Sequence, residues 1–451
     1  MKNLYGILSG MVMQRDEKDE CVCVIGAACS GTLRTSLGSL TPLDNGRYLL
    51  RGIPTGGPYA LTLSDDEGSA AFDHLYVGDV WLLGGQSNME GVGYIGDDPG
   101  YRPSPLIRSL RMDNQWVVAH PILHQYWLSP YPVYNSHEGA PAPGTRQERG
   151  VGPGYYFARE MLRRTGVPQG LISGALGGSC MGQWNPERAP EEKGNNLYWT
   201  TMERVRLSGG RVRGIFWYQG CAEANEGGAG IFVKNMKRMV AAFRRDLEDV
   251  QLPFVQVQIC RFTLPFGAES DIWWNRIREL QRTLDTKIPM LDTVAVTNAS
   301  MTDGIHISTA SQMALGKNAA ESMFRFCFDA EGKQSLLAPA LEEIFIARGC
   351  PRFGSAIGLR YRNIHGALRA DGVPTGFALS SDPSRIDMAQ ICRVELEGDT
   401  VYLRHELPGE RLPSLYCSYF FGTDSYANIT DGALRPLPAF GPISLADIRE
   451  K

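Results

Sequence analysis

The middle of this 451-residue chain alternates between nearly continuous apolar runs and amphipathic segments. Apolar runs of this length are typical of buried strands, and a 3.6-residue apolar period is typical of helices. Their alternation predicts a parallel sheet covered by helices on both faces. The predicted strands span 79–85, 169–178, 212–220, 253–260 and 290–298, and the predicted helices span 152–166, 230–249, 271–286 and 308–326. Ser308 is the expected N-cap of the last helix.

The two ends of the chain have a different pattern. Short strands with two-residue alternation follow one another there, separated by turn signals rich in Gly, Asp and Asn. We therefore expect three parts: an N-terminal β-sandwich-like domain at 1–78, a central α/β domain at 79–330 and a C-terminal β-rich domain at 331–451. Residues 92–150 are irregular and rich in Pro and Gly, and a loop of this length is usually functional or forms the wall of a site.

Unusual polar or glycine residues stand at the ends of three predicted central strands, and an Asp-x-x-His segment precedes the last helix. Ligands of parallel sheets bind at the carboxyl ends of the strands, so these residues are expected to share one edge. The residues are Ser87, the pair Gly177 and Gly178, Gln219, Asp303 and His306.

These residue types provide every component of acyl transfer. A serine hydroxyl needs an adjacent base, and a histidine can accept its proton and return it to the leaving group. An aspartate fixes the histidine tautomer. The amides of Ser87 and Gly178 (or Gly177) and the Gln219 side chain are candidate donors to the oxyanion. Each has a structural alternative: a turn serine, a capped Asp303–His306 turn, a tight glycine turn, or a glutamine that satisfies buried backbone groups.

Further residues are candidates for contact with a substrate. Gln86 and Asn88 flank the serine, and the aromatic residues Trp184, Tyr218 and Trp274 could form a platform for a sugar. Taken singly, each aromatic residue is equally expected in the core. Cys221 is expected to be a buried, inert thiol.

Composition narrows the classes of partner. The net charge of −4 provides no basic footprint for nucleic acid, and no apolar run approaches a membrane-spanning length. Ten cysteines are too dilute for a disulfide scaffold, and none has zinc-ligand spacing, so neither a metal nor another cofactor is expected. The N-terminus lacks a long hydrophobic region, which favours a cytoplasmic location, with secretion as the alternative. The sequence does not predict the oligomeric state.

Four blocks in this order, "GGQSNMEG" (84–91), "GALGGS" (174–179), "FWYQG" (216–220) and "DGIH" (303–306), resemble the sialate O-acetylesterase family of SGNH hydrolases. The resemblance extends to the two β-rich ends, for example "MVMQRD" (11–16) and "VELEGDTVYL" (394–403). It implies a flavodoxin-like, three-layer α/β/α SGNH hydrolase domain flanked by N- and C-terminal β-rich regions.

The resemblance implies metal-free removal of O-acetyl groups from an acetylated mono- or oligosaccharide. Ser87 would be the nucleophile, His306 the base and Asp303 its orienting acid, and Gly178 and Gln219 match the oxyanion positions. Many relatives read Gln-Gly-Glu with an Asn two positions further on, where this chain has Cys221 and Glu223. This departure puts an acidic or oxyanion contribution of that loop in question. Acetylxylan or another plant polysaccharide is an alternative substrate. An SGNH lipase or thioesterase and a non-catalytic carbohydrate-binding protein are alternative functions.

Overall fold

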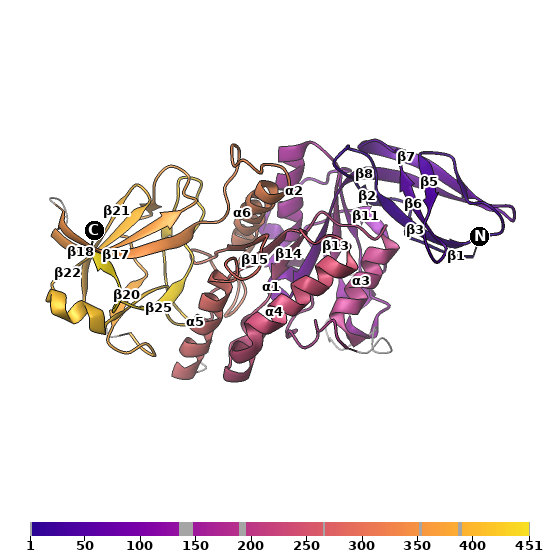
Figure 1. Cartoon of the computed structure of the whole chain (residues 1–451). Helices are drawn as coiled ribbons and strands as arrows, with labels where there is room; N and C mark the ends of the chain where they lie inside the picture. The colour runs from indigo at the N-terminus through magenta and orange to yellow at the C-terminus, as the bar shows by residue number, and fades with distance from the viewer. Residues whose placement is uncertain are drawn as a thin grey trace.

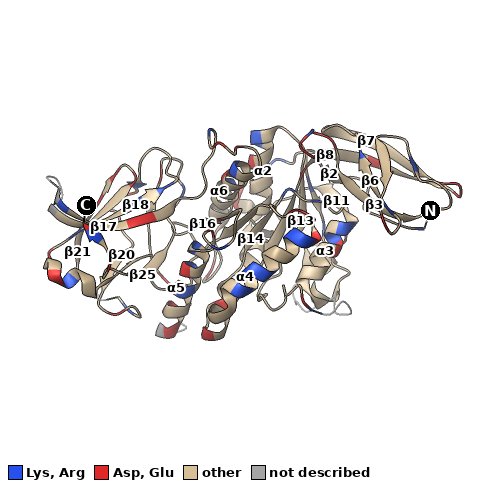
Figure 2. Ribbon diagram, in the orientation of Figure 1, with Lys and Arg blue, Asp and Glu red and all other residues tan. Residues whose placement is uncertain are grey.

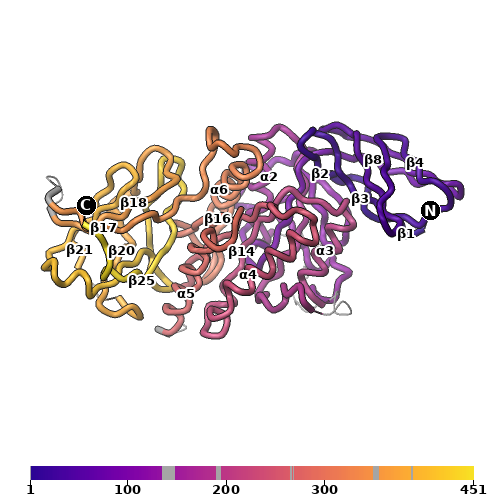
Figure 3. Tube along the Cα trace, in the orientation of Figure 1, coloured from indigo at the N-terminus to yellow at the C-terminus, as the bar shows by residue number. Residues whose placement is uncertain are grey.

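The computed structural model describes residues 2–134, 148–188, 195–264, 267–350, 354–386 and 390–450. It is a mixed α/β protein in which the helices gather in the middle of the molecule (Figure 1). The N-terminal strands lie at one end and the C-terminal strands at the other, so the two chain ends are far apart (Figure 3). This arrangement places the α/β part between two regions built mainly of strands.

The central sheet has the strand order β11-β10-β13-β8-β14-β15-β16. The five strands from β13 to β16 run parallel, and their order corresponds to 2-1-3-4-5 along the chain, as in flavodoxin-like sheets. The strand order reverses at β8, so ligands are expected at its carboxyl end. The strands are β8 (Ser69–Gly85), β10 (Ile107–Leu110), β11 (Trp116–Val118), β13 (Gln169–Ser173), β14 (Gly214–Tyr218), β15 (Phe254–Val257) and β16 (Leu291–Val294).

The four predicted helices are present, with bounds shifted by one to four residues. Helix α2 packs against α6, and α4 packs against α5. The side chain of Ser308 accepts a hydrogen bond from the amide of Ser311, so it caps α6 as predicted. Basic and acidic residues are interspersed along these helices (Figure 2). The helices are α1 (Ser87–Glu90), α2 (Gly154–Thr165), α3 (Leu197–Leu207), α4 (Glu226–Asp246), α5 (Ala268–Arg282) and α6 (Thr309–Cys327).

Helix α3 and strand β10 were not predicted from the sequence. The face that α3 buries includes the polar residues Thr200, Thr201 and Arg204, so its apolar period is weak. Strand β10 lies inside the irregular stretch 92–150 and reads "IRSL", yet it pairs with β13 and is buried. A short two-stranded ribbon, β9 (Gly93–Tyr94) with β12 (Arg149–Val151), lies in the same stretch.

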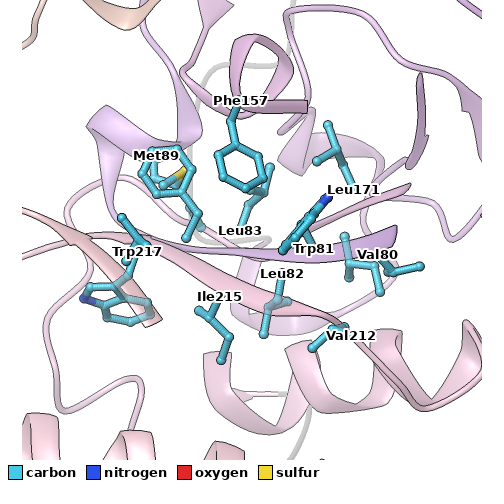
Figure 4. Close-up of a cluster of buried hydrophobic side chains, with 14 of the residues drawn as sticks. Val80, Trp81, Leu82, Leu83, Met89, Phe157, Leu171, Val212, Ile215 and Trp217 are labelled. Carbon is cyan, nitrogen blue, oxygen red and sulfur yellow. The ribbon is translucent and has the colours of Figure 1, made fainter. Parts of the chain in front are cut away.

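The core around the second half of β8 explains why the sequence is apolar at each position from Val80 to Leu83. Trp81 and Phe157 lie on one side of the sheet, while Leu82 and Ile215 lie on the other (Figure 4). The rings of Trp81 and Phe157 meet edge to face with their centroids 5.2 Å apart. A strand that is buried on both faces needs large apolar side chains at odd and even positions alike.

Strand β8 also belongs to the N-terminal region. Its first half pairs with β2 and β7, and its second half with β13 and β14. The predicted boundary between residues 78 and 79 therefore falls inside one continuous strand. The remaining N-terminal strands are β1 (Lys2–Tyr5), β2 (Val12–Gln14), β3 (Cys23–Ala28), β4 (Arg34–Thr35), β5 (Ser39–Pro42), β6 (Arg47–Arg51) and β7 (Gly56–Ser64).

The C-terminal region has its own apolar core, separate from the core that the N-terminal and central parts share. Its largest sheet has the order β21-β22-β18-β17-β26, beside the smaller sheets β20-β23-β25 and β19-β24. These strands are β17 (Ala340–Cys350), β18 (Gly354–Arg362), β19 (Arg369–Ala370), β20 (Phe377–Ser380), β21 (Ile391–Glu397), β22 (Thr400–His405), β23 (Tyr416–Tyr419), β24 (Ile429–Thr430), β25 (Phe440–Ser444) and β26 (Arg449–Glu450).

Candidate active site

Ser87 follows the carboxyl end of β8, at the point where the strand order of the sheet reverses. Gly85 makes this end possible, because its φ is +136° and a Cβ there would lie 2.2 Å from the carbonyl oxygen of Tyr218. Any other residue would push the two strands apart. The chain then turns into the single turn of α1, which leaves Ser87 partly exposed.

The two polar neighbours of Ser87 hold separate loops. The Oε1 of Gln86 accepts hydrogen bonds from the amides of Gly220 and Cys221, each at 3.1 Å. The Oδ1 of Asn88 accepts from the amide of Ile307 at 3.1 Å. Both side chains are buried, so their expected role in substrate contact is not what the structure shows. They instead fix the β14 loop and the histidine loop to the serine turn.

Ser87, His306 and Asp303 lie within hydrogen-bond distance in the order expected for a catalytic triad. The Ser87 Oγ is 2.9 Å from His306 Nε2, and His306 Nδ1 is 2.8 Å from both carboxylate oxygens of Asp303. A carboxylate accepts only from a protonated Nδ1, so this geometry leaves the Nε2 lone pair facing the serine hydroxyl. The arrangement is suited to proton transfer from Ser87 to His306.

Asp303 is held by its own loop and by a distant arginine. Its Oδ1 accepts hydrogen bonds from the amides of Ile305 and His306, both at 3.0 Å, and Arg149 donates to Oδ2 at 2.8 Å. Partial burial acts to raise the pKa of Asp303, but hydrogen bonds from His306 and Ile305 outweigh it and lower the pKa below its usual value. Asp303 is therefore kept as a carboxylate beside His306.

The glycine loop after β13 lies next to Ser87. A Cβ on Gly177 would lie 3.6 Å from that of Ser87, but the Gly177 amide already donates to Glu90 Oε2 at 2.5 Å. Gly178 has a φ of +68° and open space where a Cβ would be. Of the two glycines considered, Gly178 is thus the one whose surroundings leave room for a substrate.

Gln219 is placed differently from the prediction. Its Nε2 donates to Glu223 Oε2 and to the carbonyl of Ser179, so both amide hydrogens are used within the protein. Glu223 also accepts from the amide of Met181 at 2.7 Å. The side chain of Gln219 therefore braces two loops against each other and does not present a donor to an oxyanion here. Glu223 supplies an acid to this loop although position 221 is a cysteine.

The predicted aromatic platform is also corrected by the structure. Trp184 and Tyr218 are fully buried, and Trp274 is 4% exposed. Trp184 packs edge to face on Trp217, and Trp274 stacks on Phe262 and donates its Nε1 hydrogen to the carbonyl of Cys260. These three residues are core residues and offer no face to a sugar. The sequence shows which residues are aromatic, but it does not show whether each side chain points into the core or toward solvent.

Two further residues at the site, Glu90 and Arg149, were not predicted. Glu90 lies within the serine block, but neither its spacing nor its type signals contact with the glycine loop 87 residues later. Arg149 is 154 residues from Asp303 in the sequence, so only the fold brings them together. Burial raises the pKa of Cys221, so it remains a protonated thiol.

Across the described ranges, no three His, Cys, Asp or Glu side chains are grouped in a way that could hold a metal ion. No helix in those ranges has both the length and the apolar character that crossing a bilayer requires.

The chain is similar to known carbohydrate esterases. Residues 77–325 match the family described as carbohydrate esterase, sialic acid-specific acetylesterase. A probable carbohydrate esterase of Arabidopsis thaliana is 27% identical over 270 residues, covering 55% of this chain and 91% of that protein. The structure of a carbohydrate acetylesterase from Xanthomonas citri has a TM-score of 0.71 at 20% identity, covering 97% of this chain and 98% of that one.

The fold is shared with the Xanthomonas protein over nearly the whole of both chains. The chain belongs to the carbohydrate esterase, sialic acid-specific acetylesterase family, whose model matches more than half of its length. The resemblance first seen in four short sequence blocks is confirmed.

Proposed function

We propose that the protein removes O-acetyl groups from sugars through an acetyl-serine intermediate, and that residues 79–330 have the three-layer arrangement of an SGNH hydrolase, built on a core shared with the N-terminal strands. The observation that carries the proposal is the 2.9 Å contact between Ser87 Oγ and His306 Nε2, with Asp303 on the other ring nitrogen. Family membership supports an acetylated carbohydrate as the substrate. The family description names sialic acid, and acetylated plant polysaccharides are the alternative.

In the first half of the proposed reaction, Ser87 Oγ attacks the acetyl carbonyl carbon while its proton passes to His306 Nε2. The oxyanion that forms accepts hydrogen bonds from the backbone amides of Ser87 and Gly178. We assign no donor role to the Gln219 side chain, because Glu223 and Ser179 already accept its hydrogens. The intermediate collapses, the bond from the carbonyl carbon to the sugar oxygen breaks, and that oxygen takes the proton from Nε2.

In the second half, His306 Nε2 removes a proton from water, and the resulting nucleophile attacks the acetyl-serine. The bond between the carbonyl carbon and Ser87 Oγ breaks, the serine oxygen regains the proton, and acetate leaves. Asp303 remains ionised throughout and stabilises the imidazolium that forms in each half.

The first prediction concerns Ser87→Ala. We expect hydrolysis of p-nitrophenyl acetate to fall by roughly 10⁴-fold or more, because removing the nucleophile of a triad has an effect of at least this size. The matched control is Ser69→Ala, an exposed serine at the other end of β8. It should keep full activity. Unfolding midpoints close to wild type for both variants would show that the fold survives, and an active Ser87→Ala protein would refute the mechanism.

The substrate is tested with a panel of O-acetylated sialic acids, acetylated xylo-oligosaccharides and acetylated monosaccharides, with acetate release as the measurement. Preference for long-chain acyl esters over acetate would instead favour a lipase or thioesterase. Tight sugar binding without acetate release would favour a non-catalytic binding protein.

A further inference from the structure

A cavity of about 470 Å³ lies where the C-terminal region meets the loop that carries Asp303 and His306. Three segments line it: the loop after β15, the loop after β16, and a loop of the C-terminal region. The lining residues used below are Arg261, Thr263, Asn298, Ser300, Met301 and Tyr426. None of these residues is a member of the triad.

The cavity adjoins the triad. Met301 precedes Asp303 by two residues, so their Cα atoms are at most about 7 Å apart. On the neighbouring loop, the amide of Thr263 donates to the carbonyl of Gly304 at 2.7 Å, and Gly304 lies between Asp303 and His306. The cavity is therefore directly beside the loop that carries Asp303 and His306.

Tyr426 is exposed to an unusual degree for an aromatic residue, at 67%. Its ring is held by the guanidinium of Arg261, which lies 3.8 Å from the ring centroid. Arg261 is in turn paired with Asp424. Tyr426 thus has a fixed partner on the protein but remains largely open to solvent, as expected of a residue that stacks on a ligand.

The remaining chemistry of the cavity is polar and close to neutral. Arg261 is the one charged side chain among the described residues that line it, and Asp424 offsets its charge. Asn298, Thr263 and Ser300 are exposed and bring amide and hydroxyl groups, which exchange hydrogen bonds with sugar hydroxyls. A carboxylate-bearing sugar would find no unpaired cation on these lining residues.

We propose that this cavity is a subsite for a neutral sugar unit linked to the acetylated one, with Tyr426 of the C-terminal region as its stacking platform. The inference rests on the proposed esterase function and deepens it. The substrate is then an acetylated oligo- or polysaccharide with an uncharged unit beside the ester, and the C-terminal region contributes directly to its recognition.

The test compares Tyr426→Ala and Tyr426→Phe with wild type on three substrates: p-nitrophenyl acetate, the acetylated xylo-oligosaccharide that wild type cleaves fastest, and acetylated xylose. Tyr426→Ala should lower kcat/KM for the oligosaccharide about tenfold, the loss of one stacking contact. The same variant should keep kcat/KM for p-nitrophenyl acetate and for acetylated xylose within about twofold of wild type, because neither substrate has a second sugar unit that could stack on Tyr426. Tyr426→Phe keeps the ring and should keep most of the oligosaccharide activity.

Val373→Ala is the matched control, because Val373 is another exposed apolar residue of the C-terminal region and does not line the cavity. It should change none of the three rates. The subsite is refuted if Tyr426→Ala leaves the oligosaccharide rate unchanged or lowers all three rates equally. It is also refuted if wild type prefers acetylated xylose to every oligosaccharide. Failure of the esterase proposal looks different, since wild type would then not release acetate from p-nitrophenyl acetate at all.

Discussion

Glu90 places an acidic side chain directly beside the proposed nucleophile. Its carboxylate accepts a hydrogen bond from the Gly177 amide, and burial raises the pKa of Glu90 to about 7. The elements packed around it bring the titratable side chains of His124, Tyr126 and Tyr134, and burial holds the pKa of His124 down at about 3, so that histidine stays neutral. Glu90 is thus a carboxyl group near Ser87 whose charge changes close to neutral pH.

The second prediction follows from the raised pKa of Glu90. Between its ordinary pKa of 4.5 and the folded value of about 7, the folded protein binds the proton more tightly than the unfolded chain does. The free energy of unfolding therefore falls as the pH rises through this window, by about 3 kcal/mol in total, and is level above it. Glu90→Gln lacks this loss.

Urea unfolding at pH 5 and pH 8 measures the effect. The free energy of unfolding of Glu90→Gln minus that of wild type should be about 3 kcal/mol larger at pH 8 than at pH 5. Glu226→Gln, which alters an exposed glutamate at the start of α4, is the control and should show no such difference. Equal responses of the two variants would mean that Glu90 does not titrate as its burial indicates.

At this scale the sequence predicted residues whose chemistry is local. Ser87, Asp303 and His306 were chosen because each type has one role in acyl transfer and each falls at the end of a predicted strand or loop. The contact between Arg149 and Asp303 depends on how two segments far apart in the sequence approach each other in the fold. Neither the spacing of apolar residues nor the composition predicts such an approach. The burial of Trp184 and Tyr218 depends in the same way on which elements cover them.

Helix α5 links the central part of the molecule to the C-terminal region through Arg278. This side chain is 1% exposed and donates to four backbone carbonyls, those of Ile259 and Cys260 on the central side and Phe420 and Gly422 on the other. Burial lowers the pKa of Arg278 to about 9, yet no carboxylate is among these hydrogen-bond partners. The guanidinium is thus used for its five donors as much as for its charge.

The third prediction is that Arg278→Met destabilises the protein by at least about 3 kcal/mol, because the carbonyl oxygens of Ile259, Phe420 and Gly422 lose the donor that Arg278 provides. The carbonyl of Cys260 keeps the hydrogen bond from Trp274. Chemical unfolding measures this value. Arg276→Met changes an exposed arginine two residues earlier on the same helix and should shift stability by less than about 0.5 kcal/mol. Similar losses in the two variants would show that the carbonyl contacts do not matter.

Elements with a strong apolar period were predictable, even where the buried face also holds polar side chains. Helices α2 and α4 bury mainly apolar residues, while α5 and α6 were predicted from the same spacing although they also bury Arg278 and Gln312. Helix α3 places Arg204 in the core, where it donates to the carbonyls of Leu110 and Met112. The guanidinium of Arg204 finds these hydrogen-bond acceptors only once the fold has formed. In the sequence, an arginine at this position interrupts the apolar spacing, so no helix was predicted there.

At the scale of the whole molecule, the chain has two apolar cores rather than three. The first includes Met11 and Leu61 of the N-terminal strands together with the central helices, and the second is confined to the C-terminal region. Turn signals in the sequence indicated where strands end. They did not show that β8 continues without a break from its pairing with β2 and β7 to its pairing with β13 and β14.

The fourth prediction tests this shared core. A chain that begins at residue 79 lacks β2, β7 and the first half of β8, which pair with one another in the full protein. It therefore exposes apolar side chains of the central part that share a core with these strands. We expect it to be insoluble or to unfold without a cooperative transition, as followed by circular dichroism. A soluble, active protein of this length would show that the N-terminal strands are dispensable.

The continuity of β8 has a consequence for anyone who recombines this protein with its relatives. A crossover placed at the edge of the matched family segment, near residue 77, would splice two parental sequences within one strand and mix side chains that evolved against different neighbours. A junction near residue 338, after the first core is complete, leaves each parent's interior intact. Chimaeras of the second kind are therefore the ones in which a foreign C-terminal region could be used to graft a new sugar preference onto an unaltered hydrolytic centre.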